Sequence, residues 1–128
     1  MLDGKAYAEQ AHKIITLFGT TLQSSPSAVP LLVTAADFLE RGKQQIVLAG
    51  DKAAPEFLAL LKVVHSRLLP NAVLLHADGA EAQAWLGSKN EALALMKPVS
   101  GHPAAYVCQN YTCQAPVSEP AALEKLLG

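Results

Sequence analysis

The chain has 128 residues, of which 51% are hydrophobic and 16% are charged, and its net charge is −1. This composition is typical of a folded globular domain and excludes a disordered chain. With 10 basic against 11 acidic residues there is no basic stripe, so we expect no nucleic-acid partner. No apolar run is long enough to span a bilayer and the polar start does not resemble a signal peptide, so we expect a cytoplasmic protein that does not bind membranes.

The first third of the chain, residues 1–42, is expected to form a helical hairpin. Apolar residues recur at helical spacing over 4–23, which predicts an amphipathic helix. A second helix is predicted over 26–41, with Ser25 as its N-cap and Pro26 in its first turn. Because this second helix is apolar around most of its circumference, we expect it to be buried on more than one side.

The rest of the chain, residues 43–128, alternates between strand-like and helical segments. Short aliphatic runs predict strands at 45–49, 72–76 and 104–108, with helical segments between them and after the last one. Continuous apolar strands separated by helices are typical of parallel sheets covered on both faces. We therefore predict an α/β lobe, a small three-layer βαβαβ unit with right-handed crossovers, whose three-stranded parallel sheet has the order 2-1-3.

Hairpin and lobe together are expected to make one domain, residues 1–128, because the length suits a single hydrophobic core. The small number of charges predicts apolar surface beyond what a soluble monomer usually shows. We expect that surface to be covered by the remainder of a larger protein or by self-association.

The carboxyl edge of the sheet is the first candidate site, formed by Gly50 and Asp51 after one strand and Asp78 and Gly79 after the next. In open α/β sheets, ligands bind beyond the carboxyl ends of the strands and near helix N-termini. A small ligand at this edge is one interpretation. The other, which we favour, is that the glycines make turns and the aspartates cap helices, because a single glycine is no phosphate-binding fingerprint.

Metal and cofactor chemistry is not indicated by the histidines. His12, His65, His76 and His102 show no pair at helical metal-ligand spacing. His76 ends one strand and His102 precedes another that is predicted to be parallel, so we expect these two at opposite ends of the sheet. We therefore predict no metal site and no cofactor.

The two cysteines, Cys108 and Cys113, are the second candidate site. Their spacing is too wide for a C-x-x-C redox motif, and no further Cys or His pair completes a zinc site within the chain. Three interpretations stay open. The favoured one is packing of buried thiols, the second is a disulfide formed across a turn at Gln109 and Asn110, and the third is metal binding between molecules.

Other catalytic arrangements are not indicated either. There is no G-x-S-x-G nucleophile motif, and the acidic residues are scattered over separate elements. Trp85 is expected to anchor the segment around it by packing.

The tail carries the most specific pattern. Residues 105–117, Ala-Tyr-Val-Cys-Gln-Asn-Tyr-Thr-Cys-Gln-Ala-Pro-Val, are followed by Ser-Glu-Pro and a short leucine helix. This tail resembles the C-terminal end of the YyaL / spermatogenesis-associated protein 20 family. The strand Gln-Ile-Val-Leu-Ala-Gly at 45–50 and the Leu-Pro-Asn step at 69–71 agree in order and spacing.

The resemblance implies an architecture. Members of the family resemble a thioredoxin-like module joined to a six-hairpin α/α toroid, and this chain looks like only their last part. It thus implies a non-catalytic accessory domain that packs against the toroid. Two alternatives stay open: a contribution of residues to a sugar-processing or thiol–disulfide site in the larger protein, and a small-ligand module at the carboxyl edge of the sheet.

Overall fold

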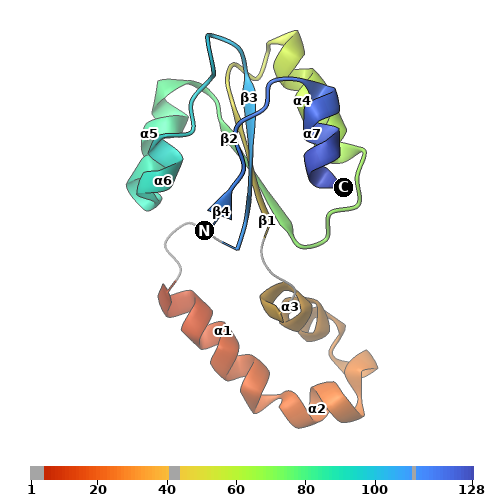
Figure 1. Cartoon of the computed structure of the whole chain (residues 1–128). Helices are drawn as coiled ribbons and strands as arrows, with labels where there is room; N and C mark the ends of the chain where they lie inside the picture. The colour runs from red at the N-terminus through yellow and green to blue at the C-terminus, as the bar shows by residue number, and fades with distance from the viewer. Residues whose placement is uncertain (1–4, 41–43, 111) are drawn as a thin grey trace.

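The computed structural model describes residues 5–40, 44–110 and 112–128 (Figure 1). A four-stranded sheet forms the middle of an α/β lobe, with helices on both of its faces, and three further α-helices lie below one end of the sheet (Figure 1). The mixed α/β class is therefore confirmed. No helix within the described ranges is long and apolar enough to cross a membrane.

The sheet has the strand order β2-β1-β3-β4. Its strands are β1 (Gln44–Ala49), β2 (Ala72–Ala77), β3 (Ala104–Gln109) and the two-residue β4 (Thr112–Cys113). The predicted order of the first three strands is confirmed, and the fourth strand was not predicted. Residues 46–49 of β1 are fully buried, as expected of a central strand with helices on both faces.

The predicted parallel direction of the third strand is wrong. β1 and β2 are parallel, but β3 runs antiparallel to β1, pairing Gln44 with Gln109 and Ala49 with Ala104. The physical reason lies in the connection after β2. Helix α5 (Gly79–Lys89) and the single turn α6 (Glu91–Ala94) descend along the sheet, and an extended segment then climbs back to the carboxyl edge before β3 begins (Figure 1). A buried apolar strand does not reveal its direction, because its side chains are covered on both faces either way.

Two hydrophobic clusters hold the lobe together, one on each face of the sheet. The first lies under α4 (Pro55–His65) and α7 (Pro120–Leu127) and includes Ile46, Leu48, Phe57, Leu60, Val64, Ala105, Val107 and Leu123. The second lies under α5 and α6 and includes Val47, Ala49, Ala77, Leu86, Leu93, Met96 and Cys108. Successive residues of β1 enter opposite clusters, as the period-2 geometry of a strand requires.

The N-terminal helical segment is more broken than predicted. It consists of α1 (Lys5–Leu17), α2 (Gly19–Ser24), the 3-10 turn η1 (Pro26–Ala28) and α3 (Pro30–Glu40). The second predicted helix starts at Pro30 and not at Pro26. Proline has no amide hydrogen to donate, so Pro30 is tolerated in the first turn of a helix but not in its interior. The Ser25 side chain makes no capping hydrogen bond.

The same segment is not buried, contrary to the expectation for its second helix. Every residue from 6 to 40 is exposed or half-buried, and α3 contains no buried residue. A hydrogen bond of 3.2 Å from Asn71 Nδ2 to Asp37 Oδ2 connects α3 to the loop before β2. In the described part of the chain, the helical segment therefore lies beside the lobe without sharing either of its two clusters.

Candidate functional site

The carboxyl edge of β1 and β2 brings the four predicted residues Gly50, Asp51, Asp78 and Gly79 to one side of the sheet. Gly50 itself is buried, and its φ of +144° is a conformation that side chains rarely adopt. A Cβ added at Gly50 would stand 2.9 Å from Cβ of Pro103, which is also buried. Gly50 therefore serves the close approach of Pro103, and the space that a ligand would enter over it is filled by protein.

The two aspartates at this edge bind the neighbouring main chain. Asp51 Oδ1 accepts a hydrogen bond of 2.8 Å from the Ala53 amide, so it closes a local turn. Asp78 Oδ1 accepts one of 3.2 Å from the Lys52 amide, and Asp78 Oδ2 lies 3.0 Å from Lys52 Nζ. The predicted caps are not formed as such, because neither Ala54 nor Asp78, the N-cap residues of α4 and α5, makes a side-chain capping hydrogen bond.

Lys52 is the member of this cluster that the sequence analysis missed. It follows Asp51 directly, and it ties the loop after β1 to the end of β2. A lysine after one strand and an aspartate after its parallel neighbour lie at the same edge of the sheet. This placement in the sequence could have predicted their ion pair. The hydrogen bonds from the Lys52 side chain and backbone amide hold the pKa of Asp78 below its ordinary value of 3.8.

Gly79 begins α5 with a φ of +77°, and a Cβ there would meet no atom within 4 Å. The conformation, not the space, accounts for the glycine at this position. The edge is thus built from turn and connection contacts, and Asp51 closes a turn where a helix cap was expected.

The histidines also need a correction. Because β3 is antiparallel to β1, His102, which precedes β3, lies at the same edge of the sheet as His76, not at the opposite end. His76 and Phe57 pack edge-on, with their ring centroids 5.4 Å apart. β1 lies between β2, which contains His76, and β3, which follows His102. Among the described residues no group of three or more metal-ligating side chains comes together.

The cysteines lie at the other end of the sheet and form a disulfide. Cys108 in β3 and Cys113 in β4 are direct partners of an antiparallel pair, with their Cα atoms 3.9 Å apart. Asn110 takes a φ of +50°, the left-handed conformation that asparagine tolerates, so the chain reverses where the second interpretation required it. Cys108 is also 6% exposed and part of the second cluster, so the favoured packing interpretation describes its surroundings but not its bond.

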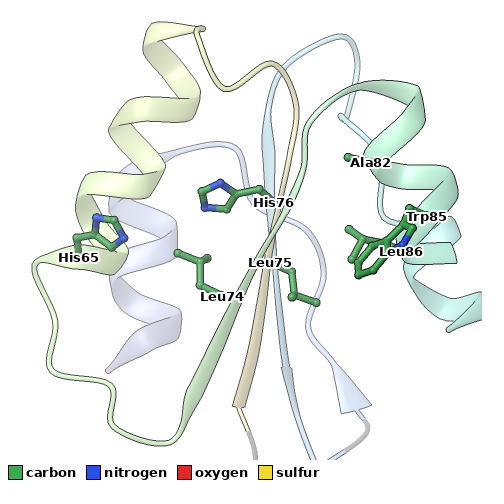
Figure 2. Close-up of a pocket in the computed structure, with 7 residues that line it drawn as sticks. All are labelled: His65, Leu74, Leu75, His76, Ala82, Trp85 and Leu86. Atoms are coloured by element: carbon green, nitrogen blue, oxygen red, sulfur yellow. The ribbon is translucent and has the colours of Figure 1, made fainter. Parts of the chain in front are cut away.

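A groove of 410 Å³ follows β2, which is an edge strand of the sheet. His65, Leu74 and His76 line it on one side of the strand, and Leu75, Trp85 and Leu86 lie on the other side (Figure 2). The strand alternation sends neighbouring side chains to opposite faces, so the groove wraps around the strand. Its lining is apolar apart from the two imidazoles.

Trp85 was expected to anchor its helix by packing, but it is 55% exposed. The neighbouring Leu86, at 4% exposure, does the anchoring in the second cluster. Helix α5 thus turns leucine towards the sheet and leaves the indole to the groove, a distinction that the short and weakly periodic sequence of this helix did not reveal.

Known proteins place the chain in context. No family profile and no solved structure matches it. Spermatogenesis-associated protein 20 from Homo sapiens is 32% identical over 123 residues, which is 96% of this chain, and the protein of that name from Rattus norvegicus is equally similar. An uncharacterized protein from Caenorhabditis elegans is 25% identical over 126 residues. The chain spans only 16% of the length of the human relative. These matches confirm the resemblance seen in the tail: the chain is homologous to one segment of the spermatogenesis-associated protein 20 family.

Proposed function

We propose that this chain is a non-catalytic accessory domain of a longer protein of this family, and that its helices α1 to α3 pack against the helical remainder of that protein. The remainder implied by the resemblance is an α/α toroid that follows a thioredoxin-like module. The observation that carries the proposal is the lack of any buried residue in the described stretch 6–40.

Large apolar side chains are exposed along this helical segment. They are Tyr7, Ile14, Leu17, Phe18, Leu31 and Val33, with exposed fractions from 38% to 85%. Full burial of one such side chain contributes about 1.5–3 kcal/mol. Several of them on one short segment favour a covered surface over a solvated one.

The lengths of the relatives support a covering partner within the same protein. The 123 matched residues are 16% of the human relative, so most of that protein lies outside the matched segment. In such a protein, a helical segment at the border of an α/β lobe has helices available to pack on. The engagement of Asp51 and Asp78 with main chain and Lys52 favours a structural role for the lobe's carboxyl edge over a reaction there.

Amide hydrogen exchange tests the proposal. The exchange of residues 5–40 is compared in this chain alone and in a full-length family protein that contains it. We expect protection of these helices to rise about tenfold or more in the longer protein, because packing raises the free energy of local opening. Amides of β1 should exchange alike in both.

A pair of charge substitutions provides the matched control. Leu31 in α3 is 85% exposed here, and Leu68 after α4 is 93% exposed. Leu31→Glu should destabilise the full-length protein by about 2 kcal/mol or more and leave this chain unaffected, whereas Leu68→Glu should change neither. Equal amide exchange of residues 5–40 in both proteins would contradict the proposal. So would a dimer of this chain that Leu31→Glu dissociates in sedimentation, because it would show that a second copy covers the helices.

A further inference from the structure

We propose that the Cys108–Cys113 disulfide is a thiol-exchange site, which a dithiol reductant opens through Cys113 and thereby releases β4 from the edge of β3. The inference does not depend on the accessory role proposed above. It concerns the end of the sheet opposite Asp78, where Cys108 of β3 pairs with Cys113 of β4.

The two cysteine residues differ in their exposure. Cys108 belongs to a strand that is paired on both sides, and it is 6% exposed within the second cluster. Cys113 belongs to the two-residue edge strand β4, both residues of which are exposed. An incoming thiolate must approach the sulfur that it attacks in line with the bond that breaks. Attack on Cys113, with Cys108 as the leaving group, is therefore the open direction.

The exchange balances with a dithiol as the reductant. Its thiolate attacks Sγ of Cys113, the bond to Cys108 breaks, and Cys108 leaves as a thiolate that takes a proton from water. The second thiol of the reductant, once deprotonated, then attacks the mixed disulfide. This step releases the Cys113 thiolate and leaves the reductant as a disulfide, so two electrons pass from the dithiol to the cystine.

The lobe is expected to stay folded when the bond opens. The disulfide joins residues only five apart in sequence, so it restrains the unfolded chain little compared with a bond that closes a long loop. β3 is held by six residue pairs with β1, and four of its residues are buried. Neither support involves β4.

β4 itself has few other attachments. Its ladder to β3 has two residue pairs, and just beyond it the Gln114 amide donates a hydrogen bond of 2.9 Å to the Val107 carbonyl. The next connection is the bridge between Ala105 and Val117, and residues 112–116 are all exposed. Reduction breaks the covalent bond that holds residues 112–116 to β3. The remaining hydrogen bonds of this segment then open more often, and the outer edge of β3 becomes accessible.

Thiol counting with hydrogen exchange tests the switch on the whole 128-residue chain, with dithiothreitol as the dithiol. We expect no reactive thiol before reduction and two after it under native conditions. Circular dichroism should be unchanged, and the Gln114 amide should exchange about tenfold faster after reduction. Amides of Ile46 and Leu48 in the central strand should not change.

Two single variants test the direction of attack. In Cys108→Ser the remaining Cys113 should form a mixed disulfide with oxidised glutathione at least about tenfold faster than Cys108 does in Cys113→Ser, because its thiol is accessible. Equal rates would overturn the assigned direction. Thiols that appear only after denaturation, loss of the lobe's fold on reduction, or two free thiols that a mild oxidant does not join would each overturn the proposal.

Discussion

Two glycines, Gly50 and Gly79, lie at the carboxyl edge of the sheet, which was considered as a ligand site. Gly50 and Gly79 both have positive φ, but only Gly50 has a neighbour in the way of a side chain. The two positions therefore separate the cost of a backbone conformation from the cost of a steric clash.

Gly50→Ala is expected to lower the free energy of unfolding by about 3 kcal/mol, because it adds a clash with Pro103 to the strain of its φ. Gly79→Ala should cost only about 1 kcal/mol, since it meets no atom and pays for φ alone. Urea unfolding of both variants measures the difference. Equal losses would show that Pro103 moves away without cost.

The lowered pKa of Asp78 makes a prediction about pH. A carboxylate whose pKa is lower in the folded state than in the unfolded state contributes stability above its ordinary value of 3.8, and loses it as the pH falls through the lowered pKa. Asp78→Asn should therefore be less stable than the original chain at neutral pH. The two should converge in strong acid.

Urea midpoints between neutral pH and about pH 2 check this convergence. Lys52→Met is the control background, because it removes the side-chain partner, which is the largest cause of the lowered pKa, and keeps the backbone amide in place. If Asp78→Asn has the same pH-dependent effect in that background, the Lys52 side chain is not the cause.

Helix α4 illustrates how burial divides one element. Leu60 is fully buried in the first cluster, whereas Leu58, two residues earlier, is 50% exposed. Leu60→Ala should cost about 2–5 kcal/mol of unfolding free energy, since it leaves a cavity. Leu58→Ala should cost less than about 1 kcal/mol. Thermal or urea unfolding of the two variants measures this difference in stability. Similar losses would mean that something outside this chain buries Leu58.

Among the elements, the sequence predicted the strands whose continuous apolar run indicates burial on both faces of the sheet. The aliphatic run of β1 identified a central strand, and the order 2-1-3 followed from it. The direction of β3 could not be read in the same way, because a run covered on both faces has no directional signal. The start of α3 was readable, since Pro30 is disfavoured in a helix interior, but Ser25 and Pro26 indicated an earlier start.

The candidate sites divide in the same manner. The turn role of Gly50 and the local bond of Asp51 follow from residue type. The ion pair between Lys52 and Asp78 and the groove beside Trp85 depend on which strands are neighbours, so they needed the fold. The disulfide was one of three interpretations because it requires β4, a strand of two residues that is too short to leave a periodic pattern.

For the whole molecule, the structure separates a lobe with two clusters from a helical segment with none. Among the residues whose burial the structure describes, every buried hydrophobic one lies in the stretch from Ile46 to Leu123. A chain that starts at Gln44 should therefore fold and unfold cooperatively, with a melting temperature within a few degrees of the original. Calorimetry of the shortened chain measures this. A lobe that fails to fold would mean that the helical segment contributes to its stability despite its exposure.

The position of β1, first of the strands in sequence and central in the sheet, has a kinetic consequence. Gln44 pairs with Ala72 on one side, but with Gln109, far later in the chain, on the other. During synthesis, the edge of β1 that pairs with β3 therefore has no partner until the tail has emerged. Pairings so distant in sequence also slow folding. A chain truncated before Ala104 should accordingly bind the dye ANS, which reports exposed apolar surface. A truncated chain that binds no ANS would show that another segment covers this edge of β1.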